Sequence, residues 1–131
     1  MGAGSTRNLT LDTGALIAFE RGVGRVRQLL LEALDNGADI AIPAGALAQA
    51  WRDGSRQARL ARLLADRGTR TESLTEAIAR AAGALCARAN TADVVDASVV
   101  ICARRQGNAV VLTSDAEDLV RLDPGLRVVS V

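Results

Sequence analysis

The segment Asn8–Glu20, NLTLDTGALIAFE, joins an apolar run directly to a helical pattern, and this junction indicates how the chain folds. Its first residues, Asn8–Asp12, predict a short strand, and Thr13–Glu20 predict a helix that begins straight after the strand. The aspartate at the junction, Asp12, is a residue type that commonly caps a helix N-terminus. A buried strand followed at once by a helix is typical of an α/β protein.

The alternation of strands and helices continues along the chain. Further strands are predicted at 39–43, 69–74, 108–115 and 126–131, and further helices at 24–37, 44–53, 56–66, 75–89, 91–103 and 116–122, with a hinge at Gly54. The strands are continuous apolar runs, which favours a parallel sheet covered on both faces. We therefore expect one domain over residues 1–131, a three-layer α/β/α fold with a central, mainly parallel sheet of four to five strands.

The composition excludes several kinds of active site. The chain of 131 residues is 49% hydrophobic and has no His, Tyr or Lys. It therefore cannot build a Ser-His-Asp or Cys-His nucleophile, a Schiff-base lysine, a P-loop lysine or a histidine-rich zinc site. Cys86 and Cys102 both fall in apolar helical segments, so we expect two buried thiols rather than a disulfide or a metal ligand.

The N-terminal residues and the longest apolar runs bear on the location of the protein. MGAGSTRN has no apolar segment behind it, which argues against a secretory signal, and no apolar run approaches the length that spans a bilayer. Met1–Thr6 matches the loose N-myristoylation pattern, but so short a pattern often matches by chance. We expect a cytoplasmic protein that does not associate with a membrane.

Basic residues are concentrated in one part of the chain. All 16 are Arg, and six of them lie in Trp51–Arg70, WRDGSRQARLARLLADRGTR, against Asp53 and Asp66. The net charge of +1 does not by itself indicate a nucleic-acid-binding protein. Two interpretations of this segment remain open, a solvated helix face or a phosphate-binding patch.

Two aspartates interrupt the apolar segment Thr91–Ala103, TADVVDASVVICA. Thr91 is the predicted N-cap, which puts Asp93 in the first turn, where the helix dipole favours a carboxylate. Asp96 lies a turn further on the same face, in a helix whose apolar residues predict burial. A buried carboxylate must be paired, hydrogen-bonded or metal-bound. A salt bridge to an Arg is the structural interpretation of Asp96, and a cation site is the functional one.

Two other acids lie where predicted strands end. Asp12 follows the first strand and Asp115 follows the strand at 108–115, so both belong to the carboxyl edge of the sheet, where ligands bind in open α/β folds. Each is also a plausible helix N-cap. Converging carboxylates need cations, and oxygen ligands without His or Cys favour Mg²⁺ or Mn²⁺ over zinc. With Asp96, these acids predict a metal site that can activate water and neutralise a phosphodiester.

Four blocks of the sequence together resemble a known family. LDTGALIAFE, IPAGALAQAWR, DVVDASVVICA and VVLTSDAEDLVRL are similar, in order and spacing, to the blocks of a PIN domain, most closely to the VapC-type toxins of bacterial toxin-antitoxin pairs. The resemblance covers essentially the whole chain. It implies an endoribonuclease that depends on Mg²⁺ or Mn²⁺, cleaves structured RNA such as tRNA or rRNA, is neutralised by an antitoxin and is usually dimeric.

The resemblance also implies roles for individual residues. The family's catalytic acids, which bind its metal, correspond to Asp12, Asp96 and Asp115. Accessory acids of some members correspond to Asp93 and Asp118. Hydroxyl groups that often support the family's site correspond to a further set, Thr13, Thr113 and Ser114.

One block departs from the family pattern. Where the family usually has its second acid, this chain has Gln49, which offers a carbonyl oxygen but no negative charge. The loss of charge is expected to weaken metal binding or to alter the general base. Two functions therefore stay open, a metal-dependent ribonuclease toxin and a PIN-fold module that binds RNA or an antitoxin without efficient cleavage.

Overall fold

A computed structural model describes residues 8–131, so the interpretation of Met1–Thr6 lies outside the described residues. Five parallel strands form one sheet in the order β3-β2-β1-β4-β5. The strands are β1 (Leu9–Leu11), β2 (Ile40–Pro43), β3 (Thr69–Glu72), β4 (Val110–Thr113) and β5 (Val128–Ser130). The helices are α1 (Thr13–Glu20), α2 (Gly24–Asp35), α3 (Ala44–Ala50), α4 (Ala58–Ala65), α5 (Glu76–Ala89), α6 (Val94–Arg105) and α7 (Ala116–Leu122).

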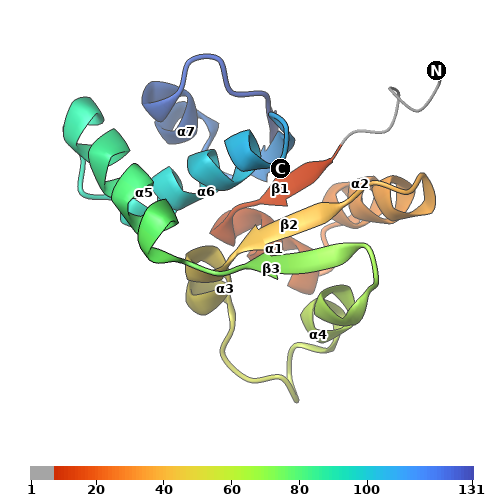
Figure 1. Ribbon diagram of the computed structural model, residues 1–131. Coiled ribbons are helices and arrows are strands. Elements are labelled where there is room, and N and C mark those ends of the chain that lie inside the picture. Colours follow the sequence, from red (N-terminus) through yellow and green to blue (C-terminus); the bar gives the residue numbers. More distant parts are fainter. Residues whose placement is uncertain (1–7) are drawn as a thin grey trace.

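The order of the strands follows from the handedness of their connections. From β1 the chain moves outward through β2 to β3, with α1, α2 and α4 packed together on one side of the sheet (Figure 1). It then returns past β1 to β4 and β5, and α5, α6 and α7 pack together on the other side. A right-handed crossover places helices on opposite faces when the direction of strand addition reverses. The predicted three-layer α/β fold with a parallel sheet is therefore confirmed.

The core consists of apolar side chains from β1, β2 and β4 and from the helices on both faces. Leu11, Ile40 and Leu112 on the strands are buried, as are Leu16 on α1 and Val99 on α6. Because these strands are covered on both faces, β2 and β4 are apolar at successive positions, and in β1 the polar Thr10 is buried as well. Cys86 and Cys102 are free and buried in helices, as expected.

The expected hinge at Gly54 proves to be a longer connection. Helix α3 ends at Ala50 and α4 begins only at Ala58. The side chain of Gln57 stabilises this connection: its Oε1 accepts from the N–H groups of Arg52 and Asp53 at 2.8 and 3.0 Å, and its Nε2 donates to the carbonyl of Ala50 at 2.9 Å. These hydrogen bonds satisfy backbone groups outside a helix, which propensity alone does not predict.

In the part of the chain that the structure describes, every helix is too short or too polar to cross a membrane.

Candidate functional site

The carboxyl ends of β1 and β4 meet at the point where the strand order reverses. Leu11 of β1 pairs with Leu112 of β4. Asp12 follows β1 directly at the start of α1, and Asp115 stands immediately before α7. In open α/β sheets a crevice forms at such a reversal, because the two connections leave toward opposite faces.

Asp12 is buried and its carboxylate is held by its neighbours. It is the N-cap of α1, as the junction predicts, and its Oδ1 accepts from the N–H of Ala15 at 2.8 Å. The hydroxyl of Thr113 donates to its Oδ2. Burial raises the pKa of Asp12 above its ordinary value, although the hydrogen bonds from Thr113 and Ala15 act in the opposite direction.

The hydroxyl residues connect the starts of α1 and α7. The oxygen of Thr113 that donates to Asp12 also accepts from the N–H of Asp115 at 2.8 Å. Ser114 lies against Gly14, where a Cβ atom would stand 1.7 Å from the serine Oγ. A glycine at position 14 is therefore needed for this close approach. Thr113 and Ser114 thus fix how β4 passes the beginning of α1.

The start of α6 differs from the expectation. The N-cap is Asp93, not Thr91, because Asp93 Oδ1 accepts from the N–H of Asp96 at 3.0 Å. Thr91 Oγ1 instead accepts from the N–H of Asp93 at 3.2 Å, one step upstream. Asp96 consequently lies in the first turn and is half-buried rather than buried, beside Val94, which is 56% exposed. A carboxylate in a first turn is favoured by the helix dipole.

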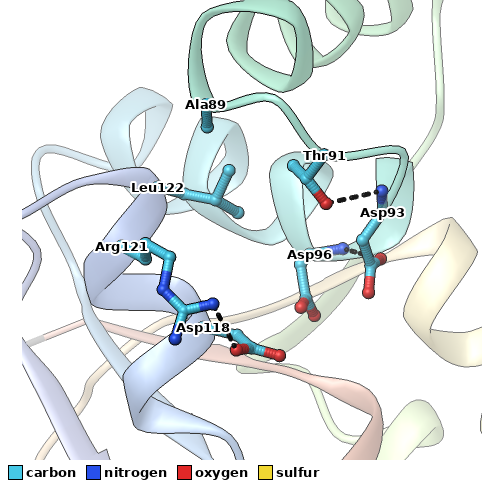
Figure 2. Close-up of a pocket in the computed structure, with 7 residues that line it drawn as sticks. All are labelled: Ala89, Thr91, Asp93, Asp96, Asp118, Arg121 and Leu122. Carbon is cyan, nitrogen blue, oxygen red and sulfur yellow. Dashed lines mark hydrogen bonds and ion pairs between the residues drawn. The ribbon is translucent and has the colours of Figure 1, made fainter.

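Three carboxylates converge at this edge of the sheet. Asp96, Asp115 and Asp118 each offer one oxygen, and these oxygens all lie within 4.8 Å of one another. Figure 2 shows the carboxylates of Asp96 and Asp118 turned toward each other across the pocket. The group therefore draws on α6 and on the start of α7. Asp12 is not one of its three members, whereas Asp118, expected only as an accessory acid, is.

Burial and neighbouring acids raise the pKa of two cluster members, Asp96 and Asp115. Burial, followed by the charge of Asp93, raises the pKa of Asp96 to about 7, and the charges of Asp115 and Asp12 add to the effect. The pKa of Asp115 is also raised, first by its hydrogen bond with Asp118 and then by burial. Asp12 thus affects both acids through its charge.

The salt bridge that would explain Asp96 structurally is absent among residues 8–131. None of the arginines described there lies within ion-pair distance of Asp96, and Asp115 makes no side-chain cap to α7. Both carboxylates therefore have oxygen atoms available for a ligand. Asp96, which is half-buried, carries a desolvation cost that an added cation relieves.

A pocket of about 110 Å³ opens beside the cluster. The pocket lies between the start of α6 and the end of α7, and Arg121 is the one basic residue among the described residues that line it (Figure 2). The Nη1 atom of Arg121 lies 3.5 Å from Oδ1 of Asp118, one turn earlier on α7. The sequence analysis did not single out Arg121, although its i,i+3 spacing from Asp118 is visible in AEDLVRL.

Gln49 stands on the exposed side of α3, close to the start of α1. Its Oε1 accepts from the hydroxyl of Thr13 at 2.7 Å. Helix α3 contributes no carboxylate to the cluster of Asp96, Asp115 and Asp118. Gln49, the residue that departs from the family pattern, is thus hydrogen-bonded to Thr13, which directly follows Asp12.

The donor set fits a hard divalent cation. Every ligand atom that the cluster offers is a carboxylate oxygen, and Mg²⁺ and Mn²⁺ favour such ligands together with water. The raised pKa of Asp96, caused first by burial and then by neighbouring negative charges, is typical of residues at functional sites. The residues present therefore fit the metal that the sequence resemblance implies.

Comparison with known proteins adds information about the fold. No protein-family model and no curated protein matches the chain. Among solved structures, a chain of FitAB bound to the IR36 DNA fragment matches with a TM-score of 0.63 and 17% identity, over 93% of this chain and 94% of that one. A chain of VapBC2 from Rickettsia felis, bound to a DNA fragment from their promoter, matches with a TM-score of 0.65 and 16% identity, over 94% of this chain and 98% of that one.

TM-scores of 0.63 and 0.65 establish a shared fold, and at identities of 17% and 16% the likeness concerns the fold alone. The alignments span nearly all of each chain, so the whole α/β architecture is similar and not one motif alone. The PIN-like fold indicated by the four sequence blocks is thus confirmed, and the chain has the fold of chains found in the FitAB and VapBC2 complexes.

Proposed function

We propose that this protein is a metal-dependent endoribonuclease that hydrolyses RNA phosphodiesters, and that it is the toxin of a toxin-antitoxin pair. The observation that carries the proposal is the convergence of Asp96, Asp115 and Asp118 within 4.8 Å beside an open pocket. The structural alternative for Asp96 is an ion pair with an arginine, and Asp96 has no such partner among the described residues. One domain spanning residues 1–131 would carry this function.

Each acid has a distinct task in the proposed site. Asp96 and Asp115, with Asp118, hold a Mg²⁺ or Mn²⁺ ion, which when bound supplies an activated water and neutralises charge on the phosphate. Asp12 is one of the catalytic acids, and its negative charge acts on Asp96 and Asp115. Its hydrogen bond with the N–H of Ala15 positions the start of α1. Asp93 caps α6 and orients the turn that carries Asp96. Thr113 and Ser114 hold the end of β4 against the start of α1.

The partners of the protein follow from the same proposal. Its RNA substrate is of the structured kind, tRNA or rRNA, and it acts in the cytoplasm as a homodimer held inactive by an antitoxin. Support comes from the fold shared with chains of FitAB and VapBC2, both of which were solved with DNA. An antitoxin segment that inhibits the site would place a cation on the acids and apolar side chains against Leu122 and Ala89 in the pocket.

A second candidate function rests on Gln49. Its amide is neutral, and its Oε1 is already engaged by Thr13. A site with one acid fewer binds metal more weakly, so the chain would then be a PIN-fold module that binds RNA or an antitoxin without efficient cleavage.

An RNA cleavage assay with a metal titration separates the two candidates. The purified protein is incubated with tRNA and rRNA in Mg²⁺, in Mn²⁺ and in EDTA, and Mn²⁺ binding is measured by calorimetry. A nuclease cleaves in either metal, stops in EDTA and loses cleavage on Asp96→Asn. Metal binding and RNA binding without cleavage would support the module, and no metal binding would contradict the proposed enzyme.

A further inference from the structure

Arg121 shares a carboxylate with the metal cluster. It lies in the last turn of α7, and its side chain is 73% exposed. Its guanidinium pairs with Asp118 at 3.5 Å, and Asp118 is also one of the three cluster acids. Figure 2 shows the guanidinium at the rim of the pocket, with the Asp118 carboxylate between it and Asp96.

A metal ion and Arg121 would compete for Asp118. The carboxylate has two oxygens, but a divalent ion on one of them brings two further positive charges next to the guanidinium. An exposed ion pair is weak, and the arginine side chain is long and flexible. A metal ion bound at Asp118 would therefore release the guanidinium of Arg121.

We propose that Arg121 is a phosphate-binding positioning residue that is released by metal binding. In the metal-free protein Arg121 pairs with Asp118. When a metal ion binds Asp118, the guanidinium moves away from this carboxylate to a position over the pocket, where it binds a phosphate of the RNA backbone. This inference rests on the proposed function. It also meets a need of the site, because Asp93, Asp96 and Asp118 line the pocket and repel phosphate. A guanidinium matches phosphate geometry well.

The consequence is positive coupling between metal and RNA. Each ligand strengthens the binding of the other by the same factor, because linkage is reciprocal. The metal contributes part of this coupling by contacting the phosphate itself. Arg121 contributes a separate part, which removal of its charge eliminates.

Mn²⁺ calorimetry provides the first test, with Arg121→Gln and a matched control. The control is Arg80→Gln, which removes another exposed arginine, paired with Glu76 at 2.7 Å on α5. Arg80 is about 14 Å along that helix from Ala89, the α5 residue that lines the pocket. We expect Arg121→Gln to raise Mn²⁺ affinity about threefold at low salt, because Asp118 no longer pairs elsewhere. Arg80→Gln should leave Mn²⁺ affinity unchanged.

The salt dependence of RNA binding provides the second test and separates the release of Arg121 from a general charge effect. The probe is a short 2′-O-methyl polyuridylate, checked for intactness after each titration. In Mn²⁺, Arg121→Gln should reduce the slope of log K against log salt by about 0.7, the loss of one phosphate contact. In EDTA its slope should equal that of the wild type, and Arg80→Gln should match the wild type in both conditions.

Three results would overturn the inference. Equal slopes for wild type and Arg121→Gln in Mn²⁺ would mean that Arg121 contacts no phosphate. Equal losses of slope in Mn²⁺ and in EDTA would mean that its phosphate contact does not depend on metal. A wild-type protein that binds no Mn²⁺ would overturn this inference together with the proposed function, whereas the first two results leave the proposed function intact.

Discussion

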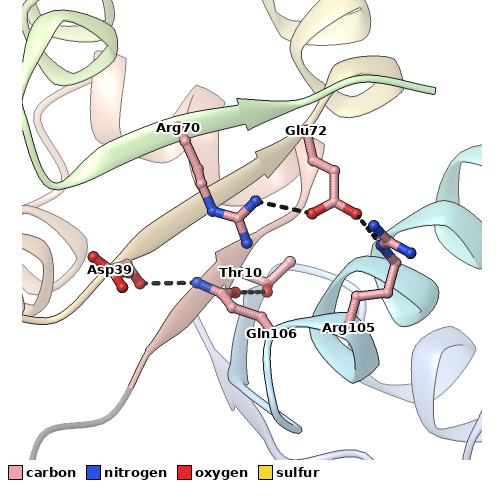
Figure 3. A network of polar contacts seen from close by, with 6 residues as sticks. All are labelled: Thr10, Asp39, Arg70, Glu72, Arg105 and Gln106. Atoms are coloured by element: carbon pink, nitrogen blue, oxygen red, sulfur yellow. Dashed lines mark hydrogen bonds and ion pairs between the residues drawn. The ribbon is translucent and has the colours of Figure 1, made fainter. Parts of the chain in front are cut away.

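Two acidic sites in this protein, Glu72 at the end of β3 and the cluster of Asp96, Asp115 and Asp118, have opposite surroundings. Glu72, at the end of β3, has a side chain that is only 10% exposed, and it lies between two arginines. Arg70 Nη1 lies 3.2 Å from one of its oxygens and Arg105 Nε 3.0 Å from the other (Figure 3). The chain thus satisfies a nearly buried carboxylate with two cations of its own.

A set of neutral hydrogen bonds lies beside the Glu72 ion pairs (Figure 3). The hydroxyl of buried Thr10 donates to Gln106 at 2.7 Å, and the Gln106 amide donates to the carbonyl of Asp39 at 3.0 Å (Figure 3). These contacts join β1 and the start of β2 to the end of α6. The network around Glu72 therefore holds α6 on the sheet, and it stabilises the fold.

The acidic cluster lacks such internal partners. Three carboxylates lie within 4.8 Å of one another, and the only arginine near them in the described chain is Arg121, on the rim. Glu72 is thus neutralised by two arginines of its own chain, whereas the three clustered carboxylates have, among the described residues, Arg121 alone on their rim. This difference supports the proposed cation site at the cluster.

The largest expected effect is that of Asp96→Asn on RNA cleavage. Removing one ligand of the metal should lower the cleavage rate about a thousandfold, since a metal ion contributes several kcal/mol of transition-state stabilisation. In the metal-free protein the same change relieves repulsion, so the unfolding free energy should be equal or higher. Single-turnover cleavage and urea unfolding measure the two effects. Unfolding of the variant without metal would show that Asp96 is a structural residue.

Glu72→Gln should show the reverse pattern. The change leaves Arg70 and Arg105 without their carboxylate, and we expect a loss of about 2 kcal/mol in unfolding free energy, between the values for exposed and buried ion pairs. Cleavage below the unfolding temperature should be retained. Glu76→Gln is the control, because its partner Arg80 is exposed and that pair should contribute little. Loss of cleavage by a folded Glu72→Gln protein would break the comparison.

Gln49→Glu should make the metal site stronger. If the side chain at position 49 reaches the cluster, an added carboxylate there is expected to raise metal affinity about tenfold, roughly 1.4 kcal/mol, and to increase cleavage in parallel. Ala48→Glu, which adds the same charge one position earlier on the exposed side of α3, should have a much smaller effect. If metal affinity is unchanged in Gln49→Glu, the side chain at position 49 does not reach the metal, and its hydrogen bond to Thr13 is its main role.

The smallest effect concerns the pH dependence of stability without metal. The pKa of Asp96 is about 7 in the folded protein against 3.8 for a free side chain, so between these values the folded state binds more protons. Stability should therefore fall as pH rises through this window, by about 1 kcal/mol once the partial exposure of Asp96 is considered. Urea midpoints across the window should show a larger fall in wild type than in Asp96→Asn, where only the raised pKa values of Asp12 and Asp115 still contribute. A rise in stability instead would show that Asp96 has a cationic partner.

The sequence predicted the elements well because their signals are local. The start of α1 after Asp12, the end of α2 before Gly37 and the cap of α5 at Thr75 follow from periodicity and from residues at element ends. The order of strands was open, although continuous apolar strands predicted that they run parallel. Where a side chain satisfies distant backbone groups, as Gln57 does between α3 and α4, local propensity was misleading.

For the site, the sequence by itself determined which chemistry was available. A chain without His, Tyr or Lys has carboxylates as its acid-base groups and metal ligands, and strand ends place Asp12 and Asp115 at one edge of the sheet. Only the tertiary structure decided which acids meet. The packing of α6 against α7 sets Asp96 beside Asp115 and Asp118, and brings Arg121 to the rim. The distance between side chains on two different helices depends on how the helices pack on the core, and no local pattern encodes it.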